Sequence, residues 1–172
     1  MDQPPKENVA NRLSGNATPV LPDERQSTNS TPNVSANITL LVNGVGFNTP
    51  EAKVLSLLGK PQQIKKKEFD DCAGGYHRDL IYDGLRIDLL SDANGRNYAI
   101  TQMDLTSPRW TIFPDLQIGD SFTRIREVFG EPIYPKEEEG CLFYGIKGAD
   151  GLVTFCQADG ILVRIYLNQT LC

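Results

Sequence analysis

The sequence holds little of the material from which most catalytic and membrane-spanning proteins are built. It has one histidine, one tryptophan and four cysteines among 172 residues. Acidic residues outnumber basic ones by 22 to 17, and the net charge of −5 gives the chain no overall field that would attract nucleic acid or anionic lipid. No apolar run approaches the roughly 18 residues of a transmembrane helix. We therefore do not expect an enzyme, a nucleic-acid-binding protein or a protein with a membrane-spanning helix.

The first 37 residues contain no aromatic residue and no cysteine. They hold five of the eleven prolines, together with many Asn, Ser and Thr residues. This composition buries too little apolar surface to offset the chain entropy lost on folding. We therefore expect residues 1–37 to form a disordered tether and residues 38–172 to form the ordered domain.

Cysteine usage indicates the compartment. The four cysteines are even in number, follow the tether and show no C-x-x-C spacing for metal or redox chemistry. Disulfides persist in oxidising compartments. A polar, Pro-rich tail before such a domain is typical of bacterial envelope lipoproteins. We therefore expect a periplasmic protein, tethered to the outer membrane through a lipidated Cys upstream of residue 1 that was removed with the signal. The alternative is a cytosolic protein with four free thiols.

Two segments, 71 residues apart, share one pattern. Lys53–Pro61 and Arg124–Pro132 each have the form of a short helix that ends in Gly, followed by a Pro that prevents its continuation. Thr49 and Asp120 are predicted to cap the two helices. The predicted apolar faces are Val54, Leu57 and Leu58 in the first helix and Phe122, Ile125, Val128 and Phe129 in the second.

Strand-like segments follow each helix. They span 62–69, 78–82, 84–90 and 97–105 in the first half and 142–146, 151–157 and 161–167 in the second. Asp-Gly and Asn-Gly pairs between them predict tight hairpins. Each half, about 44–113 and about 114–172, is too small to fold stably alone. The sequence therefore predicts an α+β fold, in which two tandem helix–β-meander repeats form one antiparallel sheet with the helices on one face.

The motifs of these halves resemble a known family. They are "LGKP" at 58–61, "FGEP" at 129–132, the opening "GDSF" at 119–122 and the Asp-Gly hairpins. Together they resemble the β-lactamase-inhibitor-protein-like repeat fold, which is also seen in small outer-membrane assembly lipoproteins. The resemblance covers about residues 44–172. The first repeat departs from it at its opening, where Phe47-Asn48-Thr49 stands at the position of Ile118-Gly119-Asp120 in the second repeat. It implies inhibition or neutralisation of an enzyme or toxin by a concave sheet.

A four-residue turn at 147–150 sets the register of the second hairpin. Counting outward from that turn places Cys141 opposite Cys156, so we predict a disulfide between them, worth about 3 kcal/mol for a closed loop of about fifteen residues. Cys72 has no partner within its own half. By elimination it is predicted to pair with Cys172.

Aromatic and Arg side chains provide the candidate binding residues. Ile161, Val163, Ile165 and Leu167 alternate as a core face, which leaves Leu162, Arg164 and Tyr166 to point outward. Tyr and Trp with Arg on an open sheet face are typical of protein-binding hot spots. The predicted partner-binding residues are Tyr98, Trp110, Tyr144, Arg164 and Tyr166. The alternative is that most of them complete the core, with Trp110 as a wedge between the repeats.

Other constellations are weaker. Cys72 and His77 could form a nucleophile and base only if the thiol were free. The simpler interpretation of His77 is a surface or strand-edge side chain. Gly44 and Gly46 lack the third glycine and the βαβ context of a dinucleotide loop. We therefore predict no catalytic residues and no cofactor.

Charge clusters offer little more. The acidic runs 68–71 and 137–139 lack the alternating oxygen ligands of a calcium loop, so we predict no metal site. They leave a basic partner surface as a minor hypothesis. Lys65–Lys67 is interpreted as a charged edge strand that discourages sheet-to-sheet association.

The sequence thus predicts a non-catalytic periplasmic binding module, an inhibitor or immunity protein that neutralises an enzyme or toxin. Its expected partner is another protein, with no nucleic acid, and it meets the membrane only through a lipid anchor. The alternative is a structural lipoprotein of outer-membrane assembly or the cell envelope.

Overall fold

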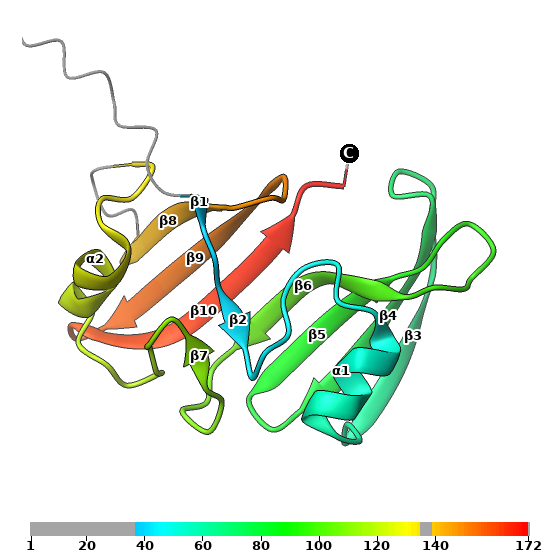
Figure 1. Ribbon diagram of the computed structural model, residues 1–172, viewed down its shortest axis with the longest axis horizontal. Coiled ribbons are helices and arrows are strands. Elements are labelled where there is room, and N and C mark those ends of the chain that lie inside the picture. The colour runs from blue at the N-terminus through cyan, green and yellow to red at the C-terminus, as the bar shows by residue number, and fades with distance from the viewer. Residues whose placement is uncertain (1–36, 135–138, 172) are drawn as a thin grey trace, which may run out of the picture. The chain divides into compact units, whose positions relative to one another are not determined.

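The computed structural model describes residues 37–134 and 139–171. Residues 1–36 of the predicted tether, most of the second acidic run and Cys172 lie outside this range. The described part is mostly antiparallel sheet with two helices, in keeping with an α+β class (Figure 1).

Eight strands form the main sheet, in the order β1-β8-β9-β10-β6-β5-β4-β3. They are β1 (Asn37–Ile38), β3 (Gln63–Asp70), β4 (Gly75–Tyr82), β5 (Leu85–Leu90), β6 (Ala99–Leu105), β8 (Cys141–Ile146), β9 (Gly151–Ala158) and β10 (Ile161–Gln169). All neighbours are antiparallel except β1 and β8, which run parallel. A second, two-stranded sheet pairs β2 (Leu41–Val42) with β7 (Ile112–Phe113). The strands of the two predicted meanders therefore meet where β10 pairs with β6.

The helices α1 (Glu51–Leu58) and α2 (Thr123–Phe129) end where the sequence predicts. Gly59 and Gly130 stop them with φ angles of 79° and 76°, and each backbone N–H donates to a carbonyl of the last turn. The predicted caps are wrong. The Thr49 hydroxyl accepts from the Gly46 N–H and the Asp120 carboxylate from the Gln117 N–H, so both stabilise the approach to a helix rather than its first turn.

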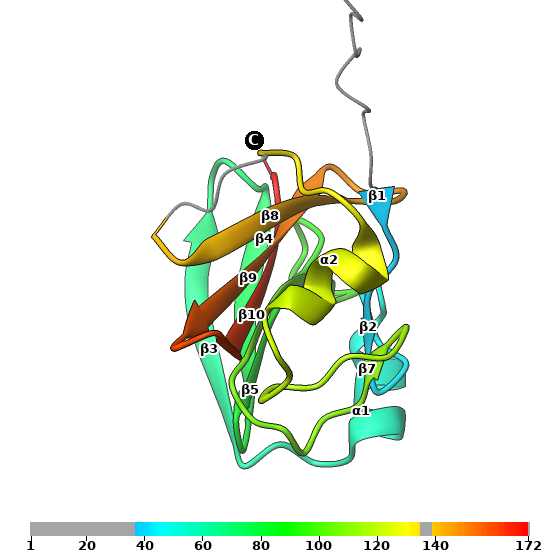
Figure 2. The ribbon, with the colours of Figure 1, turned by 90° about the vertical axis from the view of Figure 1, so that its left-hand side faces the viewer.

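Cross-strand registers align side chains in rows over the whole sheet. Two rows are buried, and their members pair in sequence from β8 to β4. They are Leu142, Phe155, Ile165, Leu105, Leu85 and Tyr82, and then Tyr144, Val153, Leu167, Met103, Ile87 and Leu80. Figure 2 shows both helices and the β2–β7 pair on the same side of the sheet. The two rows form the core beneath them.

A β-bulge changes the phase of β10. Leu162 pairs with Gln157 and Arg164 with Cys156, so Val163 is left without a partner in the ladder. Leu162 is consequently buried, whereas Ile161 and Val163 are 41% and 39% exposed. The predicted core face is wrong for these three residues. It is right beyond the bulge, where Ile165 and Leu167 are buried.

The second hairpin has the predicted register. Cys141 lies opposite Cys156, and a disulfide joins them. The predicted Cys72–Cys172 pair involves Cys172, outside the described residues. None of the cysteines that the structure describes is a free thiol.

Candidate protein-binding face

The face of the sheet opposite the helices is the candidate site, and we call it the open face. Two further rows of paired residues lie on it, alternating with the core rows. They are Phe143, Thr154, Tyr166, Asp104, Arg86 and Ile81, and then Gly145, Leu152, Asn168, Gln102, Asp88 and Asp79. No helix or strand of the described ranges covers this face.

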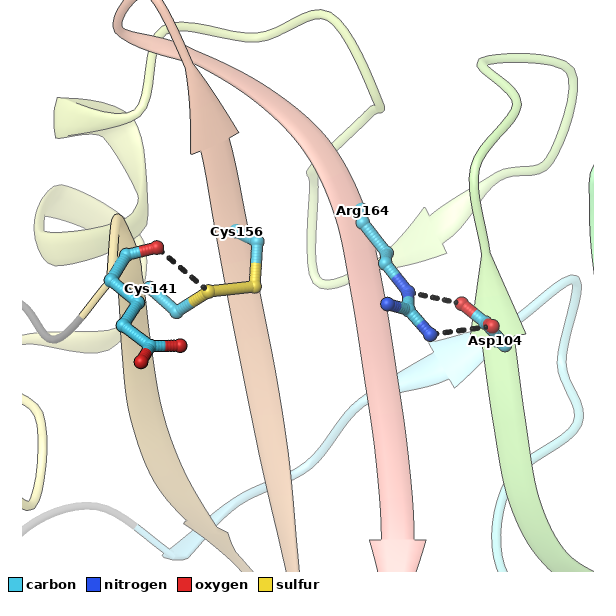
Figure 3. Close-up of a disulfide and its surroundings, with 5 residues drawn as sticks. Asp104, Cys141, Cys156 and Arg164 are labelled. Carbon is cyan, nitrogen blue, oxygen red and sulfur yellow. Dashed lines mark hydrogen bonds and ion pairs between the residues drawn. A yellow bond between two sulfur atoms is a disulfide. The ribbon is translucent and has the colours of Figure 1, made fainter.

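Arg164 and Tyr166 lie on the open face as predicted. Arg164 reaches from β10 to Asp104 on β6, and its Nε and a terminal NH2 nitrogen each donate to a carboxylate oxygen at 2.8 Å (Figure 3). The Arg164 guanidinium carbon lies 5.5 Å from the centre of the Tyr166 ring. The Tyr166 hydroxyl donates to Gln102 on β6. These contacts fix two side chains while half of Arg164 stays exposed to solvent.

An aromatic and apolar edge extends this patch toward β8. The rings of Phe143 and Tyr134 pack edge to face with centroids 6.2 Å apart, and Tyr134 is 52% exposed. Leu152 on β9 is also exposed. The sequence prediction missed all three residues. Leu142, Tyr144 and Ile146 are buried, and alternation against that core set would have placed Phe143 on the open face.

Tyr144 and Trp110 do not reach the open face, so the prediction that they contact a partner there is wrong. Tyr144 is fully buried beneath α2, where its hydroxyl donates to the Gly130 carbonyl. Burial raises the pKa of Tyr144 to about 12. Trp110 packs on the Tyr82 ring and donates through Nε1 to the Asp83 carbonyl. Both residues complete the core, which is the alternative that the sequence left open.

Tyr98 belongs to the helix side of the sheet. Arg78 stacks on its ring at 3.9 Å, and the same guanidinium donates to both carboxylate oxygens of Glu51 on α1. Although burial alone would lower the pKa of Arg78, the bonds to Glu51 raise it. Tyr98 therefore helps to anchor α1 and does not lie beside Arg164 and Tyr166.

A charged network occupies the other end of the open face, over β3, β4 and β5. Asp88 is 1% exposed and accepts from Lys67 Nζ at 2.6 Å, and its other oxygen lies 2.5 Å from His77 Nδ1. Lys67 also pairs with Asp79 at 3.1 Å, while His77 Nε2 lies 3.2 Å from Asp70. The sequence favoured a surface or strand-edge position for His77, whose side chain is 12% exposed and is a member of this network.

The network stabilises the charged forms of Asp88, Lys67 and Asp70. Burial alone would raise the pKa of Asp88, but hydrogen bonds from Lys67 and His77 outweigh burial and hold that pKa below its usual value. Burial alone would lower the pKa of Lys67, but its bonds to Asp88 and Asp79 raise it. The N–H groups of Ala73 and Cys72, with His77, lower the pKa of Asp70.

A depression of about 550 Å³ lies beside this network. Its walls include Lys67, Asp70, His77, Asp88, Gln102 and Gln169. It lies on the open face because Asp88, Gln102 and Asn168 share one cross-strand row.

The described residues offer few groups for a catalytic or metal site. Cys72 carries no free thiol, which removes the nucleophile of the Cys72–His77 pair. Within residues 37–134 and 139–171, no group of three or more His, Cys, Asp or Glu side chains could hold a metal ion. No helix in the described part of the chain is both long enough and apolar enough to span a membrane.

Comparison of the chain with protein-family models, curated proteins and solved structures gave no match.

Proposed function

We propose that this protein is a non-catalytic, envelope-associated binding module that neutralises an enzyme or toxin through its open face. The observation that carries the proposal is the patch of Arg164, Tyr166, Phe143 and Tyr134. Arg and aromatic side chains dominate the energetics of protein interfaces, and these are held in place by neighbours before any partner arrives. Such order lowers the entropy lost on binding.

We further propose that the domain is a duplicated helix–meander unit with the β-lactamase-inhibitor-protein-like architecture. A matched set of contacts supports this. The Tyr82 hydroxyl donates to the Gly59 carbonyl at 3.0 Å, and the Tyr144 hydroxyl donates to the Gly130 carbonyl at 2.8 Å. Each contact ties a helix end to a strand of its own half.

Backbone contacts beside these tyrosines correspond as well. The Gln62 N–H donates to the Ile81 carbonyl, and the Ile133 N–H donates to the Phe143 carbonyl. Donors differ by 133 − 62 = 71 residues and acceptors by 143 − 81 = 62. The two tyrosines also differ by 144 − 82 = 62. On this alignment the inner six strands are symmetric about the β10–β6 pair, with β8 corresponding to β4 and β9 to β5, whereas the edge strands β1 and β3 do not correspond.

A photo-crosslinking experiment tests the proposed function. A photoreactive residue at Tyr166 should crosslink to one protein partner in envelope extracts, whereas the same residue at Leu57, 48% exposed on α1, should not. Adding Tyr134→Ala should weaken the Tyr166 crosslink without a change in the circular dichroism of the domain. Equal crosslinking at both positions would contradict the binding-face assignment.

The identity of the captured protein separates the two functions predicted from the sequence. A soluble enzyme or toxin supports neutralisation, and its activity should fall when the purified module is added. Capture of outer-membrane assembly or cell-wall proteins instead supports the structural lipoprotein.

A further inference from the structure

We propose that β3, an edge strand of the main sheet, is a docking site for an extended acidic segment of another protein, which adds to the sheet as a further strand. This surface is separate from the patch of Arg164, Tyr166, Phe143 and Tyr134, because β3 lies at the end of the sheet away from β8 (Figure 1). The inference goes beyond the proposed function and does not depend on it.

The two edges of the sheet differ in what covers them. At the β8 edge, β1 pairs with Gly145 and Ile146, and the Ile133 N–H donates to the Phe143 carbonyl at 2.8 Å. At the other edge, β3 pairs with β4 alone among the described residues. The outward N–H and C=O groups of this eight-residue strand are therefore available to a strand of another protein.

Two apolar side chains of β3 are exposed on the helix side of this edge. Ile64 pairs with Leu80, which belongs to a core row, and Phe69 pairs with Tyr76, which lies on the same side of β4 four residues away. Ile64 is 48% exposed and Phe69 is 41% exposed. A strand added beside β3 places its own side chains next to both, and so buries apolar area that the isolated domain leaves in water.

The charge of the edge favours an acidic strand. Lys65 and Lys66 are exposed on opposite faces of β3, and neither forms an ion pair with a residue that the structure describes. The cross-strand neighbour of Lys66 is another cation, Arg78. Lys67, by contrast, is committed to the charged network. Carboxylates opposite Lys65 and Lys66 would pair with both cations, whereas a basic strand would meet like charge.

The same lysines disfavour a second copy of this chain at the edge. Because of the bulge between them, Lys66 and Phe69 are two ladder positions apart, as are Ile64 and Lys66. An antiparallel pair of β3 strands that sets Ile64 opposite Phe69 therefore sets Lys66 opposite Lys66 of the other copy. Like charges directly opposite each other destabilise a pairing. The edge thus selects an acidic strand over its own copy.

The register defines a peptide probe. Antiparallel to β3, the added strand has an apolar residue opposite Phe69, carboxylates opposite Lys66 and Lys65, and an apolar residue opposite Ile64. The probe is the blocked peptide Thr-Val-Thr-Glu-Glu-Val-Thr, and the charge control has Lys in place of both Glu residues. The backbone control is the probe N-methylated at the first Val and at the Thr that follows it. Since neighbouring N–H groups of a strand point to opposite edges, one of these two faces β3.

Amide resonances and hydrogen exchange of the isotope-labelled protein locate the binding. We expect saturable shifts of the β3 amide resonances with the probe, and slower exchange at alternate β3 residues, those whose N–H points away from β4. The charge control and the backbone control should each bind about tenfold more weakly.

Charge reversal in the protein provides the matched test. The double variant Lys65→Glu with Lys66→Glu should prefer the lysine peptide to the probe, because the signs of both pairs are reversed together. Lys147→Glu changes an exposed lysine in the β8–β9 turn and should leave the preference of the unmodified protein unchanged.

The absence of any shift would overturn the inference, as would equal binding of the N-methylated peptide or shifts without slower exchange in β3. Protection of the same amides that rises with protein concentration, without peptide, would assign the edge to a second copy instead. The titration of the unmodified protein decides the question even if the double variant does not fold. None of these outcomes alters the crosslink expected from Tyr166, so the proposed function stands or falls separately.

Discussion

Arg164 and Asp104 form a two-point ion pair across the junction between β10 and β6. The Arg164 Nε and NH2 nitrogens each lie 2.8 Å from a different oxygen of Asp104. This pair bridges the strands at which the two halves of the sheet meet, and it also holds Arg164 in the pose in which we expect it to meet a partner. Its contribution to folding is small, however, because half of the Arg164 side chain is exposed.

The first prediction concerns this pair. A double-mutant cycle of Arg164→Ala and Asp104→Ala should give a coupling energy of about 0.5–1 kcal/mol in the free energy of unfolding, measured with urea. Arg164→Lys should lose the coupling as well, since an ammonium cannot form the two-point geometry. A coupling above about 2 kcal/mol would contradict this prediction. It would mean that the stability of the pairing between β10 and β6 depends on this ion pair.

The second prediction concerns the buried hydroxyl of Tyr144. Its pKa is raised to about 12 in the folded protein, against an ordinary value of 10.0. The unfolded chain therefore loses this proton first, and folding stability falls as the pH rises from 10 to 12. Tyr144→Phe should remove that part of the alkaline loss.

At neutral pH Tyr144→Phe should instead cost about 1 kcal/mol, because the Gly130 carbonyl loses its donor. Urea unfolding of both proteins between pH 7 and pH 11.5 measures the two effects. Tyr166→Phe serves as the control, since the Tyr166 hydroxyl lies on the open face. Parallel curves for Tyr144→Phe and the unmodified protein would contradict the burial argument.

The third prediction concerns the disulfide between Cys141 and Cys156, which are 15 residues apart in sequence. Replacing both residues by Ala should lower the free energy of unfolding by about 3 kcal/mol, since the unfolded chain regains the freedom of the closed loop. Urea unfolding measures the loss. Peptide mapping of the unmodified protein without reduction checks the predicted Cys72–Cys172 link, and a pairing of Cys72 with Cys141 would refute it.

The fourth prediction uses the two neighbouring lysines of β3. Lys67→Met removes a cation from Asp88 and Asp79 and should cost about 3 kcal/mol at pH 7, whereas Lys66→Met, on an exposed neighbour, should cost under about 0.5 kcal/mol. Urea unfolding compares them.

Acid unfolding extends this comparison. The lowered pKa of Asp88 contributes stability that is present above its ordinary value of 3.8 and is lost as the pH falls through the folded-state pKa. Without Lys67 that folded-state pKa rises, so Lys67→Met should lose the contribution of Asp88 at a higher pH than the unmodified protein. Equal acid midpoints in the two proteins would show that Lys67 does not control Asp88.

The fifth prediction compares two turn glycines with left-handed φ angles. A Cβ at Gly84 would lie 2.1 Å from the Ser107 Cβ, whereas a Cβ at Gly160 would meet nothing within 4 Å. Gly160→Ala should therefore cost only the backbone term, about 1–2 kcal/mol. Gly84→Ala should lower the free energy of unfolding by about 3 kcal/mol or more, because the β4–β5 turn must move away from Ser107. Thermal or urea unfolding distinguishes the two.

Features set by local chemistry could be predicted from the sequence. The helix ends follow from Gly59 and Gly130 with the prolines beyond them, and the Cys141–Cys156 pair follows from the length of one turn. Both depend on residues close to each other in the chain. For the same reason the antiparallel hairpins lie near the predicted positions.

Features that depend on long-range pairing could not. The bulge at Val163 has no signal in the alternation of β10, yet it decides that Leu162 is buried. Tyr144 carries a polar group but lies beneath α2, because the Gly130 carbonyl offers it a partner. The network of Lys67, His77 and Asp88 joins three strands whose order is fixed only when the sheet forms.

The position of Trp110 has a practical consequence. It is the chain's only tryptophan, it is 8% exposed, and it lies between the strand turn at Asp83 and the segment that leads to α2. Its fluorescence is therefore a built-in optical reporter of one location, the link between the two halves of the domain. Followed beside circular dichroism, which reports the whole sheet, it reveals whether that link opens before the rest of the protein or together with it.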